Sequence, residues 1–118
     1  PQAPRYTYDI PALLGKNIDA VRQILGTPSD SDSEPTPQQI RLGADQWPNS
    51  FEKDDRELLV TFNPSTRKII DFFLSGADKS TLLEVGNLKE SESKYTIEEV
   101  KQFKNPSAIT GIKIIPRL

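Results

Sequence analysis

The sequence predicts a single α+β domain over residues 1–118, built as an antiparallel sheet of about four strands with two main helices packed on one face. Two observations support this fold class. Capped segments with apolar residues at helical spacing lie near both ends of the chain, and segments rich in β-branched and aromatic residues fill the middle. A chain of 118 residues can bury one core, and 35% hydrophobic with 27% charged residues is a globular composition.

The best-defined helix is expected at residues 18–25. Asn17 is a suitable N-cap, because its side chain can accept a hydrogen bond from an N–H left free in the first turn. Gly26 suits the positive-φ position that follows a helix, and Pro28 prevents its continuation. The apolar face of this helix consists of Ile18, Val21 and Leu25.

A second main helix is expected from Thr96, because Thr96 and Glu99 match a capping box. Its apolar face would consist of Ile97, Val100 and Phe103. Residues 96–102 resemble residues 17–23, which suggests an internal duplication, although capped amphipathic helices also look alike for physical reasons. Shorter helices are expected near residues 10–14, 37–42 and 82–85, and residues 1–8 are expected to form an N-terminal tether.

Strands are expected at residues 47–51, 57–62, 68–75 and 109–115. The first contains Pro48, which cannot donate to a ladder and is typical of an edge strand. Residues 63–67 would join the second and third strands as a hairpin loop. Both strands of this hairpin carry apolar residues on both faces, whereas a sheet with helices on one side should be polar on the other.

This two-sided apolar pattern predicts a contact surface for another protein chain, either a partner or a second copy of this chain. The residues expected to form it are Trp47, Leu59, Ile69 and Phe73. Trp47 is included because aromatic side chains are enriched as interface anchors, although a single Trp at a strand start also suits the rim of a core. Internal coverage of the second face is the alternative explanation, and the hairpin register decides which residues share a face.

The chain has no Cys, His or Met, so it lacks the usual zinc ligands and the commonest general base near neutral pH. We therefore predict no catalytic residue, no metal ion and no cofactor. The net charge of −2, without a basic block, argues against nucleic acid as a partner. A carboxylate-dependent enzyme or a small-ligand carrier is the alternative, and a deep pocket with converging Arg and carboxylate side chains would favour it.

Two acidic segments are possible sites of chemistry. Residues 30–34 place carboxylates on alternate positions, as a calcium site would, but the EF-hand spacing fails and a solvated polar loop explains the segment better. Asp54 and Asp55 could pair as acid and base. Adjacent carboxylates in a tight turn point apart, however, and Asp is common in turns. We therefore interpret both segments as structural.

Residues 14–28 read Leu-Gly-Lys-Asn-Ile-Asp-Ala-Val-Arg-Gln-Ile-Leu-Gly-Thr-Pro. This segment resembles the Gly-x-Ser/Thr-x-x-Glu-Val-x-x-x-Leu-Gly-x-Pro opening of small bacterial envelope lipoproteins of the SmpA/OmlA type, and residues 63–68 are similar to that family's later hairpin turn. Asn17 and Ala20 depart from the family's hydroxyl and acid. The resemblance implies the helix–helix–sheet fold shared with the β-lactamase-inhibitor proteins. It also implies a periplasmic or outer-membrane-anchored location, through a possible upstream lipid, and a non-enzymatic protein-binding or assembly role.

Overall fold

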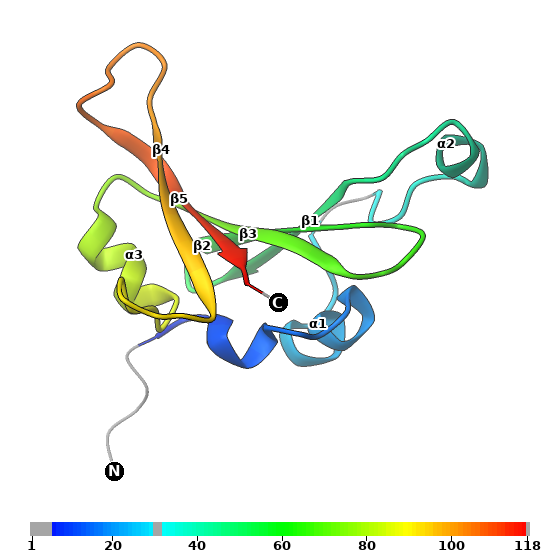
Figure 1. The fold of residues 1–118 in the computed structure, drawn as a ribbon, viewed down its shortest axis with the longest axis horizontal. Coiled ribbons are helices and arrows are strands. Elements are labelled where there is room, and N and C mark those ends of the chain that lie inside the picture. Colours follow the sequence, from blue (N-terminus) through cyan, green and yellow to red (C-terminus); the bar gives the residue numbers. More distant parts are fainter. Residues whose placement is uncertain (1–5, 30–31, 118) are drawn as a thin grey trace.

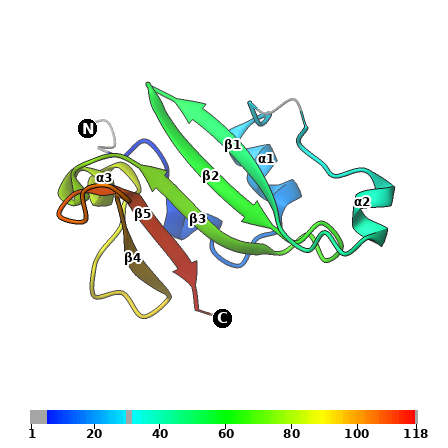
Figure 2. The same ribbon diagram turned by 90° about the horizontal axis from the view of Figure 1, so that it is seen from above.

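The computed structural model describes residues 6–29 and 32–117. It confirms the α+β class and contains a five-stranded antiparallel sheet in the order β1-β2-β3-β5-β4 (Figures 1 and 2). The elements are η1 (a 3₁₀ helix, Ile10–Leu13), α1 (Ile18–Leu25), α2 (Pro37–Arg41), β1 (Trp47–Lys53), β2 (Arg56–Phe62), β3 (Ile69–Ser75), α3 (Lys79–Val85), β4 (Tyr95–Lys101) and β5 (Ile109–Pro116). Within the described ranges, no helix is long and apolar enough to span a bilayer.

Local capping signals position the first two α-helices as predicted. The Asn17 side chain accepts a hydrogen bond from the N–H of Ala20 at 2.9 Å, and Gly26 follows α1 with a φ of 96°. A complete capping box starts α2, because Thr36 Oγ1 accepts from the N–H of Gln39 and Gln39 Oε1 accepts from the N–H of Thr36. α2 buries no residue and stands apart from the sheet (Figures 1 and 2).

The helix predicted from Thr96 is wrong, because this segment forms strand β4 and pairs antiparallel with β5. Thr96 Oγ1 accepts a hydrogen bond from Nε of Arg117 at 2.8 Å and does not cap a helix. Ile97 and Val100 are β-branched and suit a strand as well as a helix face, so pairing with β5 decides the outcome. β4 is the strand beyond the four that the sequence predicts.

Two related expectations change with β4. Residues 17–23 lie largely in α1 whereas residues 96–102 lie largely in a strand, so the two segments are not a structural repeat. Phe103 was expected on the apolar face of a helix. It lies instead in the loop between β4 and β5, where it is 99% exposed.

The core lies against one face of the sheet, where alternate side chains of β2 are buried. These side chains are Leu58, Val60 and Phe62. Ile18 of α1 and Leu82 of α3 belong to the same buried cluster. Figure 1 shows η1, α1 and α3 below the sheet, so the core lies between these helices and the sheet.

Tyr8 is also a core residue and is only 1% exposed. Its hydroxyl lies 2.6 Å from the carbonyl oxygen of Phe51 and 3.0 Å from that of Arg56. Burial, followed by the nearby carboxylate of Glu57, raises the pKa of Tyr8 to about 12. The tether predicted for residues 1–8 therefore does not include Tyr8, and residues 1–5 lie outside the described part of the chain.

Candidate functional site

The face of the sheet opposite the core is here called the open face. Its side chains alternate with the buried ones, and its central row crosses all five strands. In order across the sheet, this row is Ser50, Leu59, Phe73, Lys113 and Glu98, each opposite the next. Figure 2 views the sheet from this side, with α1 behind it.

Leu59 and Phe73 form the apolar centre of the open face. They lie directly opposite each other on β2 and β3, and both are half-buried. The Phe73 ring also covers Gly111 on β5, because a Cβ placed on Gly111 would lie 2.6 Å from Phe73 Cζ. Gly111 thus leaves the space in which the ring lies, and the apolar centre extends over three strands.

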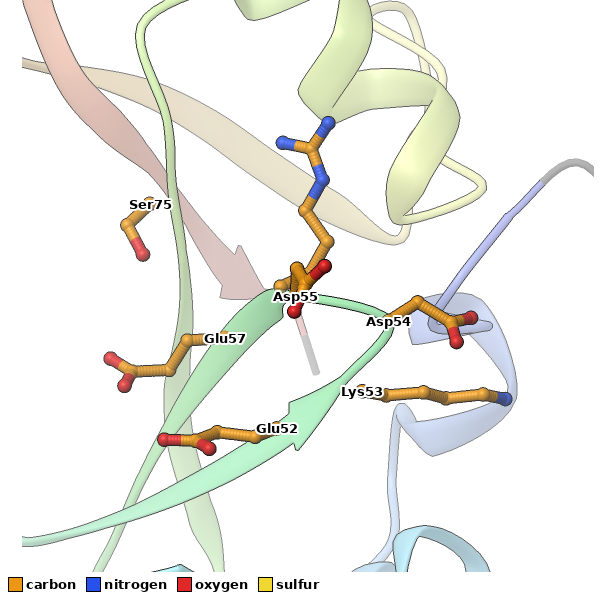
Figure 3. A pocket seen from close by; sticks show the side chains of 7 residues that line it. Glu52, Lys53, Asp54, Asp55, Glu57 and Ser75 are labelled. Carbon is orange, nitrogen blue, oxygen red and sulfur yellow. The ribbon is translucent and has the colours of Figure 1, made fainter.

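Acidic side chains surround this centre. Glu52 lies directly opposite Glu57, and Figure 3 shows both side chains on the same side of the β1–β2 hairpin. Like charges opposite each other are destabilising, and within residues 6–29 and 32–117 neither carboxylate forms an ion pair. Asp71 pairs with Lys113 at 3.6 Å. Together with Glu98, the open face presents four carboxylates, against the ammonium group of Lys113 and the guanidinium group of Arg117, whose Nε donates to Thr96 Oγ1 on the same face.

Ile69 was expected to share a face with Phe73, and the structure corrects this expectation. The register of β2 against β3 shifts between Thr61 and Phe62, so that Phe62 lies opposite Ile69 and Ile70 is an extra residue. Such a bulge reverses the alternation of side chains beyond it. Ile69 therefore packs against the core, on the face opposite Phe73.

Trp47 also lies on the core side, because it pairs with the buried Phe62. It is half-buried, and its Nε1 donates a hydrogen bond to the carbonyl oxygen of Asp32 at 2.9 Å. Trp47 thus fixes the loop before α2 to the edge of the sheet. Of the four residues predicted to contact a partner, the structure brings Leu59 and Phe73 together and places Trp47 and Ile69 elsewhere.

A cluster of four charged side chains, which the sequence analysis missed, joins α1, the loop after it and the β2–β3 hairpin. Glu34 lies between two arginines, with Oε2 2.7 Å from Nη1 of Arg22 and Oε1 2.6 Å from Nη1 of Arg67. Asp19 accepts hydrogen bonds from Nε and Nη2 of Arg67 at 3.2 and 2.7 Å. This four-charge cluster has no local sequence signal, because Asp19 and Arg67 are 48 positions apart.

The four-charge cluster rests on the ring of Phe62, which is fully buried. The guanidinium carbons of Arg22 and Arg67 each lie 5.5 Å from the centre of that ring. Hydrogen bonds from Arg67 hold the pKa of Asp19 and of Glu34 below the usual values. Because the charges pair with one another, the cluster is suited to fixing the hairpin and the loop to α1.

The acidic loop at residues 30–34 does not form a calcium site in the part that can be described. Both carboxylate oxygens of Glu34 accept hydrogen bonds from Arg67. Asp30 lies outside the described residues. Elsewhere in residues 6–29 and 32–117, no group of three or more acidic side chains is arranged to hold a metal ion.

The Asp54–Asp55 turn borders an open hollow of about 580 Å³ at the tip of the β1–β2 hairpin (Figure 3). The φ angles of the two residues are 51° and 61°, and positive values at both positions define the tight turn that suits a two-residue hairpin. In Figure 3, Asp54 and Lys53 point to one side while Glu52 and Glu57 point to the other. Asp54 therefore points away from Glu52 and Glu57, and the tight turn accounts for Asp54 and Asp55 as structural residues.

No protein-family model matches this chain, and neither a curated protein nor a solved structure matches it. The similarity of residues 14–28 to the SmpA/OmlA-type lipoproteins therefore stays an expectation. Function has to be argued from the surfaces of the domain itself.

Proposed function

We propose that this domain is a non-enzymatic module that binds another protein through the open face of its sheet. The observation that carries the proposal is the Leu59–Phe73 pair at the centre of that face. An apolar centre rimmed by charged side chains is typical of protein interaction sites. We also propose that the helices cover only the opposite face of the sheet and leave the open face free for the partner.

The charges on the open face indicate the chemistry of the partner. Four carboxylates surround the apolar centre, against the cationic groups of Lys113 and Arg117. A complementary surface carries an apolar side chain to contact Leu59 and Phe73, with Lys or Arg residues beside it. Such attraction weakens as salt is added, because ions screen exposed charges.

The bacterial cell envelope is the proposed location, and its support is the resemblance of residues 14–28 to the envelope lipoproteins. A lipid anchor upstream of the domain belongs to the same proposal. Fractionation of bacterial cells that express the full reading frame tests it. Recovery of the protein in the cytosol, with no membrane or periplasmic fraction, would contradict the proposed location.

The binding proposal is tested with random peptides displayed on phage and selected against the immobilised domain. We expect selected peptides to combine an apolar residue with Lys or Arg. Amide chemical-shift changes in the labelled domain should centre on β2, β3 and β5 around Leu59 and Phe73. Leu59→Asp should weaken peptide binding at least about tenfold, because tenfold corresponds to about 1.4 kcal/mol, a typical effect of a central interface residue.

Leu42→Asp is the matched control, because Leu42 is 80% exposed on the segment that ends α2 and lies away from the sheet. It should bind selected peptides like the wild type. Glu57→Lys changes only an exposed charge of the open face and should weaken binding of basic peptides, most strongly at low salt. Peptides that map to another surface, or equal binding by Leu59→Asp and Leu42→Asp, would disprove the proposal. If Leu59→Asp does not fold, Glu57→Lys decides.

A further inference from the structure

The two edges of the sheet differ in how they are covered. Lys53 and Arg56 flank the two-residue turn and form a hydrogen-bonded pair, so the odd-numbered residues of β1 bond to β2. The even-numbered residues of β1 therefore direct their N–H and C=O groups away from the sheet. Pro48 has no N–H, and its carbonyl oxygen accepts from Nδ2 of Asn49 at 2.9 Å. The carbonyl oxygen of Ser50 accepts from the N–H of Ser29 at 2.8 Å. Proline and the preceding loop therefore block this edge against strand pairing.

The opposite edge, β4, lacks such cover. The N–H of Arg117 donates to the carbonyl oxygen of Lys94 at 2.8 Å, so even-numbered residues of β4 bond to β5, because bonded pairs alternate along an antiparallel ladder. Tyr95, Ile97 and Glu99 consequently direct their N–H and C=O groups away from the sheet. In residues 6–29 and 32–117, no other strand or loop makes backbone hydrogen bonds to these groups.

We propose that β4 pairs antiparallel with β4 of a second copy of this chain, with Ile97 opposite Ile97 of the second copy. A row of outward N–H and C=O groups is a template for strand addition. The pairing joins two five-stranded sheets into one continuous sheet. This edge is separate from the apolar centre of the open face, so the inference does not depend on the proposed function.

Two copies of β4 can pair symmetrically about an axis at any of several residues. Charge and the number of paired residues favour the axis at Ile97. An axis at Glu98 or at Glu99 would set two carboxylates opposite each other, which is destabilising. An axis at residue 96 or 100 would pair only three residues of β4 with one another, 95–97 or 99–101. An axis at Ile97 pairs residues 95–99 and places Glu98 opposite Thr96, diagonal to Lys94 of the second copy.

The segments beyond the two ends of β4 carry opposite charges. Lys101 and Lys104 lie at its C-terminal end, whereas Glu90, which also pairs with Lys79, and Glu92 lie before its N-terminal end. Antiparallel pairing therefore brings the basic end of each copy toward the acidic end of the other. Phe103, which is 99% exposed, lies between these two lysines in the sequence.

Cysteine cross-linking tests the register, because the chain has no Cys of its own. In Ile97→Cys the two Cα atoms would be about 5.5 Å apart, within the range of about 4.4–6.8 Å that a disulfide spans. In Glu99→Cys, the matched control, they would be offset by four residues, or roughly 13 Å. Under mild oxidation, Ile97→Cys should give a covalent dimer and Glu99→Cys should not. Equal cross-linking of the two variants, or none in Ile97→Cys, would overturn the register.

Sedimentation equilibrium tests the association itself. Pairing through one short strand buries less than the roughly 1,600 Å² of a standard interface, so the dimer is expected only at high protein concentration. Glu99→Pro removes an outward N–H and leaves the bonds to β5 intact, so it should stay monomeric with an unchanged circular dichroism spectrum. Glu98→Lys should weaken the dimer, and adding Lys94→Glu should restore it.

Three outcomes would sink the proposal. The wild type stays monomeric at every concentration, Glu99→Pro dimerises like the wild type, or the charge exchange at Glu98 and Lys94 restores nothing. If the wild type stays monomeric but an extended peptide shifts the amide signals of β4, the edge pairs with a different protein and the second copy is the wrong occupant. If Glu99→Pro does not fold, the comparison of Glu98→Lys with the double variant Glu98→Lys and Lys94→Glu decides whether β4 pairs with β4.

Discussion

Replacing Arg67 by alanine should lower the free energy of unfolding by about 2 kcal/mol. The guanidinium group of Arg67 contacts both Asp19 and Glu34 at distances from 2.6 to 3.2 Å. Each partly exposed ion pair contributes about 0.2–1 kcal/mol. Stacking 5.5 Å above the ring of Phe62 adds about 0.5–1 kcal/mol. The sum of these contributions is the expected loss.

Arg67→Gly separates the side chain from the backbone. The φ angle of Arg67 is 66°, a region that costs a residue with a Cβ about 1 kcal/mol and costs glycine little. Alanine loses the contacts and keeps this cost, whereas glycine loses the contacts and avoids it. Arg67→Gly should therefore be about 1 kcal/mol more stable than Arg67→Ala, as measured by urea denaturation followed by the fluorescence of Trp47, the only Trp.

The effect of Arg67→Ala should also depend on pH. Hydrogen bonds from Arg67 lower the pKa of Glu34 from its usual 4.5 and that of Asp19 from its usual 3.8. A carboxyl group with a lowered folded-state pKa stabilises the fold above its unfolded-state pKa, and this contribution is lost as the pH falls through the folded-state value. The difference in stability between wild type and Arg67→Ala should thus be full at pH 7 and shrink below about pH 4.5.

Arg41→Ala is the matched control, because Arg41 is exposed on α2 and forms no ion pair within the described residues. It should change the free energy of unfolding by less than about 0.5 kcal/mol, as is usual for surface substitutions. The reasoning about the four-charge cluster is refuted if Arg67→Ala behaves like Arg41→Ala. A destabilisation that keeps one size from pH 7 to pH 3 would also refute it.

Three further substitutions test local features of the fold. Gly111→Ala should destabilise by at least about 2 kcal/mol in urea, because its Cβ would lie 2.2 Å from the carbonyl oxygen of Leu74; a wild-type midpoint would mean that the strands are spaced differently. Gly26→Ala should cost about 1 kcal/mol or more for its φ of 96°, and an unchanged thermal midpoint would show another conformation. Asn17→Ala should cost about 1 kcal/mol by removing the bond to the N–H of Ala20, and Asn17→Ser should recover most of it.

Two of the four residues that the sequence assigned to the candidate surface lie on it in the structure. The structure sets Leu59 and Phe73 opposite each other, and alternation along β2 and β3 had assigned both to one candidate surface with the hairpin register left open. Alternation failed for Ile69, because the bulge at Ile70 shifts the register and no turn residue marks the shift. Trp47 was assigned to the same surface with the rim of the core as the alternative, and it packs against the core, where its Nε1 donates to the carbonyl oxygen of Asp32.

The error at β4 has a physical cause of the same kind. Residues 96–103 carry a hydroxyl and an acid at capping-box spacing, and their apolar residues recur every three positions. The same side chains are β-branched or aromatic and also suit a strand. β5 offers an edge that pairs with Tyr95 through Lys101, and that long-range ladder outweighs a local helix signal.

By itself the sequence determined the elements whose signals lie within about four residues, namely the capped ends of α1 and α2, the positive φ of Gly26 and the hairpin loop before β3. Only the tertiary structure decided the fifth strand, the bulge that turns Ile69 to the core, and the four-charge cluster around Glu34. These features join residues tens of positions apart, whose contact energies appear only when the chain has brought them together. Local hydrogen bonds leave a pattern in neighbouring residues, whereas pairing between distant strands and ion pairs between distant elements leave none.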